Sequence, residues 1–196
     1  MNKYENMNIR PYKRLSALYD KDWGGYCLQY LKLIDYIIEK YKFVPKSILD
    51  ISCGTGNLLA KLYEQKYNVI GIDITPEMIE IAKNNYPYIE FHIGDMCYVD
   101  LKLKVDLITC AFDSLNYVRD DNKLDKTFKN IYKHLHTDGF LLFDINTPIL
   151  FENRHYGIIN HKYKGKKFEQ ILTYNRNCLL YTSDAADDMQ CVDLGG

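Results

Sequence analysis

The sequence predicts an α/β fold with a doubly wound, mostly parallel sheet that has helices on both faces. Five short apolar runs recur along the chain, and helix-like segments separate most of them. A glycine-containing loop follows the first run, as it does at the ligand-binding edge of open α/β sheets. The chain has 196 residues, of which 47% are hydrophobic, and this is enough to bury the core of one such domain.

The elements follow from the spacing of apolar residues. A helix is expected over residues 26–41, because Leu28, Leu31, Ile34 and Ile38 recur every three or four positions. The expected strands cover residues 47–51, 68–72, 89–93, 105–111 and 139–145. The expected crossover helices cover residues 57–65, a segment that Thr75 caps and Pro76 opens, and residues 121–135.

Four segments make up the expected organisation. Residues 1–45 form an N-terminal helical and lid segment, and residues 46–147 form the binding core. Residues 148–177 form part of a substrate-covering segment, with Lys164-Gly165-Lys166 as a turn between two short strands. Residues 178–196 change composition abruptly, show no strand or helix periodicity and resemble a translated sequencing adapter. The domain is therefore expected to be incomplete at its C-terminus and to lack its last strands.

Charge and composition exclude several classes of partner. The net charge of -1 gives no cationic field for nucleic acid or an anionic membrane surface. No apolar run approaches the roughly 20 residues that a membrane helix needs. The six cysteines are scattered, without a metal-ligating or disulfide pattern. A cytoplasmic protein without nucleic-acid or membrane partners and without a metal is expected, and its oligomeric state is not predicted.

The strongest motif is the apolar strand and glycine loop at residues 48–57. Gly54 and Gly56 allow the backbone to approach a ligand closely. Asp50 precedes the loop, where its carboxylate repels a pyrophosphate but attracts a cation. Leu59 stands where a dinucleotide-binding loop has its third glycine, so an NAD-dependent oxidoreductase is disfavoured.

Residues 49–56, Leu-Asp-Ile-Ser-Cys-Gly-Thr-Gly, resemble the cofactor-binding motif of class I, Rossmann-like S-adenosylmethionine-dependent methyltransferases of the small-molecule type. Ser52 departs from the usual first glycine of that motif. The resemblance implies S-adenosylmethionine as cofactor and places Asp73 on its ribose, Ile74 beside its adenine, and Asp95 and Met96 on the adenine edge. The implied cofactor-binding residues are Asp50, Ser52, Cys53, Gly54, Gly56, Asp73, Ile74, Asp95, Met96 and Phe112.

The segment 110–117 is expected at the carboxyl end of the fourth strand, facing the methyl donor and acceptor. It resembles small-molecule methyltransferases, including those that act on amino-sugar nitrogens, and lacks the Asn/Asp-Pro-Pro-Tyr tetrad of nucleic-acid N-methyltransferases. Asp113 and Asn116 are candidates for orienting the acceptor, and Tyr19 and Trp23 for a lid.

The resulting hypothesis is methyl transfer to a nitrogen or oxygen of a small molecule. The alternative is a non-catalytic protein that binds S-adenosylmethionine as a sensor or partner subunit. No catalytic base is assigned, because a lone histidine such as His92 or His155 is more often structural.

Overall fold

The structure, a computed structural model, describes residues 25–118, 120–147, 149, 157–163, 166–175 and 180–185. The chain divides into two units, one of Ser16–Thr147 and one of Met1–Leu15 with Pro148–Gly196. The first unit contains the predicted α/β domain, and the second contains a separate small sheet.

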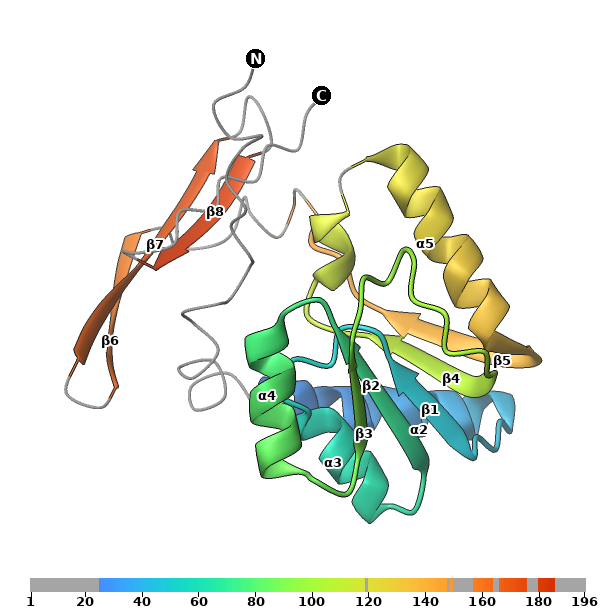
Figure 1. The fold of residues 1–196 in the computed structure, drawn as a ribbon. Helices are drawn as coiled ribbons and strands as arrows, with labels where there is room; N and C mark the ends of the chain where they lie inside the picture. The colour runs from blue at the N-terminus through green and yellow to red at the C-terminus, as the bar shows by residue number, and fades with distance from the viewer. Residues whose placement is uncertain are drawn as a thin grey trace. The chain divides into compact units, whose positions relative to one another are not determined.

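The described part of the first unit is built around a five-stranded parallel sheet in the order β3-β2-β1-β4-β5 (Figure 1). Its elements are η1 (Tyr26–Leu28), α2 (Gln29–Tyr41), β1 (Ser47–Asp50), α3 (Asn57–Glu64), β2 (Asn68–Asp73), α4 (Pro76–Asn85), β3 (Glu90–Ile93), β4 (Val105–Cys110), η2 (Ser114–Tyr117), α5 (Asp121–His134) and β5 (Leu135–Phe143). This order reverses direction between β1 and β4, which confirms the predicted doubly wound fold.

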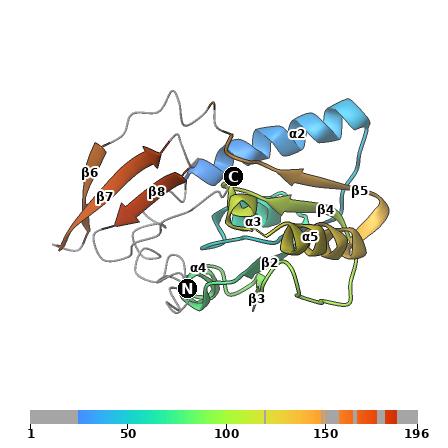
Figure 2. The ribbon, with the colours of Figure 1, turned by 90° about the horizontal axis from the view of Figure 1, so that it is seen from above.

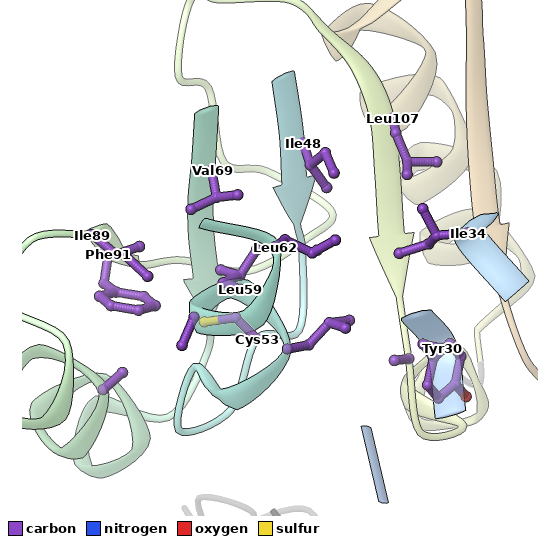
Figure 3. Close-up of a cluster of buried hydrophobic side chains, with 14 of the residues drawn as sticks. Tyr30, Ile34, Ile48, Cys53, Leu59, Leu62, Val69, Ile89, Phe91 and Leu107 are labelled. Atoms are coloured by element: carbon purple, nitrogen blue, oxygen red, sulfur yellow. The ribbon is translucent and has the colours of Figure 1, made fainter. Parts of the chain in front are cut away.

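Both faces of the sheet are covered. Successive side chains of a strand point to opposite faces, so Ile48 of β1 enters one core and Leu49 the other. The first core also takes side chains from α2, α3 and α4, which Figure 3 shows around Leu59 and Leu62. The second core takes Ile131 of α5, and α2 and α5 lie on opposite sides of β4 and β5 (Figure 2). The prediction of helices on both faces is confirmed.

One strand boundary differs by several residues from the sequence prediction, and one predicted helix cap lacks its side-chain hydrogen bond. Strand β5 begins at Leu135, whereas residue 139 was expected, because Val105 pairs with Leu135 and the register then shifts so that Leu107 pairs with Phe140. This irregularity accommodates polar residues that the apolar pattern could not assign to a strand. Thr75 occupies the N-cap position of α4 with extended backbone, but its side chain makes no capping hydrogen bond to the helix.

The second unit contains an antiparallel sheet in the order β6-β7-β8, formed by Gly157–Tyr163, Lys166–Asn175 and Leu180–Ala185. Tyr163 pairs with Lys166, so the predicted hairpin is present and Lys166 belongs to its second strand. Strand β8 lies in the segment for which no strand was expected. The backbone of this segment pairs with β7, and such pairing does not require alternating side chains.

Candidate functional site

All five parallel strands carry an aspartate at or just after their carboxyl ends, which together form one edge of the sheet. Four of the strands end next to a glycine loop, a turn or a short helix at this carboxyl edge. The five residues are Asp50, Asp73, Asp95, Asp113 and Asp144. No lysine, arginine or histidine occurs in the described segments 50–57, 73–77, 93–98, 111–118 and 144–147. The described loops of the carboxyl edge therefore carry acidic groups without a basic residue among them, which suits a cationic ligand.

The loop between β1 and α3 is held in a conformation that needs glycine. Gly54 and Gly56 have φ values of 53° and 85°, in the left-handed region. The Cys53 N–H donates to the carbonyl of Ile72 at 2.8 Å and ties the loop to β2. A Cβ atom at Gly56 would lie 2.7 Å from Cζ of Phe91, so the loop also requires the absence of a side chain.

Asp73 connects this loop to the start of α4. Its Oδ2 accepts from the Gly54 N–H at 2.9 Å, and its Oδ1 accepts from the Thr75 N–H at 2.8 Å. Burial raises the pKa of the Asp73 carboxyl, and these hydrogen bonds oppose that effect by favouring the ionised form. The carboxylate thus lies at the junction of the first two strands, and its contact with a ribose stays a prediction.

Asp50 lies deeper, at the end of β1, with 2% of its surface exposed. Its Oδ1 accepts from the Ser52 N–H at 3.1 Å. Burial raises its pKa from 3.8 to about 7, and the nearby charge of Asp73 acts in the same direction. A cation bound at the carboxyl edge would stabilise the ionised form of this carboxyl.

The raised pKa of Asp50 predicts a pH dependence of stability and binding. An unfolded aspartate releases its proton near pH 3.8, whereas folded Asp50 holds it up to about pH 7, so the folded state binds more protons in between. Stability of the ligand-free protein should therefore fall as pH rises through this interval. Affinity for a cationic ligand should rise over the same interval, because the ligand favours the ionised carboxyl.

Urea unfolding and calorimetric titration with S-adenosylmethionine across this pH range check both trends. Asp50→Asn is the control, because it removes the titrating group and should flatten both pH profiles. A variant with the same pH slopes as the wild-type protein would contradict the assignment to Asp50.

The residues expected around the adenine come together through β2 and β3. The Gly94 N–H donates to the carbonyl of Asp73 at 3.0 Å, which brings the ends of these strands side by side. Ile74 is 54% exposed and offers an apolar surface there. Asp95 uses Oδ1 to accept from the Cys97 N–H at 2.8 Å. Their contacts with adenine stay predictions.

Three predicted cofactor residues have side chains engaged elsewhere. Cys53 is buried in the first core (Figure 3), and burial raises its pKa well above the ordinary value, so only its backbone is available at the loop. The Ser52 hydroxyl donates to Sγ of Cys110 at 3.6 Å. Met96 packs against the second core, and its carbonyl accepts from Asn130 Nδ2 at 2.9 Å.

The acceptor candidates Asp113 and Asn116 contact two residues that the sequence analysis did not single out. The Asp113 N–H donates to Asp144 Oδ2 at 2.9 Å. Asn116 Oδ1 accepts from the Asn146 N–H at 2.9 Å, and Asn116 Nδ2 donates to the Asn146 carbonyl at 3.2 Å. Asp144 lies near the end of the strand predicted over residues 139–145 and directly follows the observed β5, and this place at the carboxyl edge was the signal that could have identified it. The ends of β4 and β5 are thus joined by side chains.

Other residues considered from sequence do not join this group. Tyr19, Trp23 and His155 lie outside the described residues. His92 is on β3, where its Nε2 lies 2.6 Å from Oε1 of exposed Glu90. This pairing gives His92 a structural role. Within the described residues, no three His, Cys, Asp or Glu side chains are placed to hold a metal ion. No helix in that part of the chain is long and apolar enough to cross a membrane.

Comparison with known protein families matches residues 48–139 to the family described as a methyltransferase domain. These residues are a methyltransferase domain. The match covers the strands β1 to β4, the glycine loop and the aspartates at positions 50, 73, 95 and 113. The predicted class I, Rossmann-like methyltransferase fold is therefore confirmed.

Individual relatives of the methyltransferase domain agree with this assignment. A dTDP-4-amino-2,3,4,6-tetradeoxy-D-glucose N,N-dimethyltransferase of Saccharopolyspora spinosa is 28% identical over 128 residues, which are 65% of this chain and 50% of that protein. The S-adenosylmethionine-dependent methyltransferase of Clostridium acetobutylicum ATCC 824 superposes with a TM-score of 0.67 at 26% identity, over 89% of this chain and 73% of that one. The sugar N-methyltransferase KedS8 of Streptoalloteichus sp. ATCC 53650 shares the fold, with a TM-score of 0.70 at 21% identity over 97% of this chain and 78% of that one.

The chain spans about half the length of the curated relatives that it matches, or somewhat less. The family match itself covers residues 48–139 of this chain.

Proposed function

We propose that the methyltransferase domain binds S-adenosylmethionine and transfers its methyl group to a nitrogen atom of a small-molecule amine. The cofactor carries a sulfonium and an ammonium charge, and both are complementary to an edge with Asp50 and Asp73. The left-handed glycines at 54 and 56 leave the loop backbone open to close approach, and exposed Ile74 provides an apolar surface for an aromatic ring. These features support S-adenosylmethionine as the cofactor.

The observation that carries the choice of an amine is the series of aspartates along the carboxyl edge, without a basic residue in the described loops. An acceptor with a carboxylate or phosphate next to the reacting atom would be repelled there, whereas an amine is attracted. The sequence relative from Saccharopolyspora spinosa is named as an amino-sugar N,N-dimethyltransferase, which supports the same class of acceptor.

The chemistry needs alignment more than acid or base catalysis. When bound, S-adenosylmethionine supplies an activated methyl group, so the S–CH3 bond breaks as the N–CH3 bond forms and S-adenosylhomocysteine leaves. Positive charge moves from sulfur to nitrogen during the transfer. The carboxylates of Asp113 and Asp144, just after β4 and β5, can stabilise the positive charge on the nitrogen. An amine that the aspartates attract as an ammonium ion releases one proton to solvent before attack, which frees its lone pair, and the methylated nitrogen can release a second proton after transfer. Alignment of the two reactants can lower the activation free energy by roughly 7 to 11 kcal/mol.

The test compares acceptors that differ in one atom. We expect a dTDP-amino sugar to give S-adenosylhomocysteine with a kcat/KM at least about 100-fold above that of the matching dTDP-hydroxy sugar. Formation of S-adenosylhomocysteine is measured by chromatography, with the protein omitted as control. Preference for the hydroxyl would contradict an amine acceptor. Cofactor binding without product from any acceptor would favour the non-catalytic sensor instead.

A further inference from the structure

The turn that follows β4 has an unusual backbone. Phe112 and Asp113, two consecutive residues other than glycine, have φ values of 61° and 47°. Side chains disfavour this left-handed conformation, so it persists only where surrounding contacts enforce it. The turn lies at the carboxyl edge, between the strand ends proposed for the donor and the acceptor.

Tyr30 of α2 holds the first residue of the turn. Its Oη accepts from the Phe112 N–H at 3.1 Å, across 82 positions of sequence, and the two rings lie with their centroids 5.9 Å apart. Tyr30 is 5% exposed. Burial and the Asp144 carboxylate beside its hydroxyl raise the pKa of Tyr30, so it stays protonated and can donate to that carboxylate.

Asp113, the second residue of the turn, is held by Asp144 and Asn146, which both follow β5. Asp144 accepts from the Asp113 N–H through Oδ2, as described above. Asn146 donates from Nδ2 to the Asp113 carboxylate. Both backbone N–H groups of the left-handed turn are therefore bound by side chains from elements that are distant in the sequence, and the Asp113 carboxylate is fixed in orientation.

We propose that Tyr30, Asp144 and Asn146 form a clasp that positions Phe112 and Asp113 for methyl transfer. This inference rests on the proposed function, and it adds three positioning residues to it. Without the clasp, the turn relaxes towards the right-handed backbone that side chains prefer. The Phe112 ring and the Asp113 carboxylate then leave the places that they hold beside the donor and the acceptor.

The experiment uses Tyr30→Phe and Asp144→Asn in the full chain. Each has a matched control: Tyr41→Phe changes an exposed tyrosine of the same helix, and Asp138→Asn changes an exposed aspartate of β5, the strand that Asp144 follows. Amide hydrogen exchange at positions 112 and 113, followed by NMR, reports on the turn. Calorimetry with S-adenosylhomocysteine reports on the donor site.

We expect the two clasp variants to exchange these amide hydrogens about tenfold faster and to bind S-adenosylhomocysteine about tenfold more weakly, with both controls like the wild-type protein. Unchanged exchange would overturn the clasp. Faster exchange with unchanged affinity would make its role purely structural and would overturn positioning. A wild-type protein that binds no S-adenosylhomocysteine would overturn the proposed function and positioning together, and the exchange rates would still decide whether the clasp holds the turn.

Discussion

Replacing Asp73 by alanine is expected to raise the dissociation constant of S-adenosylmethionine at least about 100-fold. A calorimetric titration would then detect no binding. The variant loses the acceptor proposed for the ribose hydroxyls. It also leaves the Gly54 and Thr75 N–H groups without the carboxylate that they share, so the glycine loop and the start of α4 are no longer held together.

Two further variants separate the causes. Asp73→Asn keeps the size of the side chain and one good acceptor oxygen, so an intermediate loss is expected. Asp125→Ala removes an exposed aspartate of α5 that pairs only with Lys129 in the described contacts, and it should bind like the wild-type protein. Wild-type affinity in Asp73→Ala would remove Asp73 from the donor site.

Replacing Gly56 by alanine is expected to destabilise the domain by about 2 to 5 kcal/mol. Left-handed backbone costs a side chain roughly 1 to 2 kcal/mol, and forcing a methyl group against a packed ring adds about 1 to 3 kcal/mol. The clash is severe here because the new Cβ would lie 2.7 Å from Cζ and 3.0 Å from Cε1 of Phe91, a residue that is itself buried. Urea unfolding measures the change in the free energy of unfolding.

Gly25→Ala is the matched control, because nothing lies within 4 Å of a Cβ built at that glycine and no left-handed φ is recorded for it. It should change the free energy of unfolding by less than about 0.5 kcal/mol. Equal stability of the two variants would show that the loop rearranges freely, contrary to its packing against β3.

The parts of the domain that could be predicted from sequence are those encoded by contiguous residues. Strand β1 and its loop show a short apolar run followed by glycines, so both the strand and the donor loop are visible locally. The buried state of Asp50 follows from the same run, because its neighbours on the strand are apolar.

The clasp was missed because its contacts join residues far apart in the sequence. Tyr30 sits in a helix whose periodicity predicts packing alone, and its partner lies 82 positions away. The left-handed φ values of Phe112 and Asp113 carry no compositional signal, since glycine is absent there. The early start of β5 was missed for a related reason, because its first paired residue, Leu135, is followed by the polar residues His136, Thr137 and Asp138.

The double hydrogen bonding of Asp73 has a consequence for the thermodynamics of ligand binding. One carboxylate fixes the glycine loop and the start of α4, on both sides of the proposed donor site, before any ligand arrives, so binding there does not have to order two independent loops. The conformational entropy of these loops is lost during folding, and the site is preorganised. A ligand that enters this edge therefore retains a larger fraction of its contact energy as affinity than it would at two mobile loops.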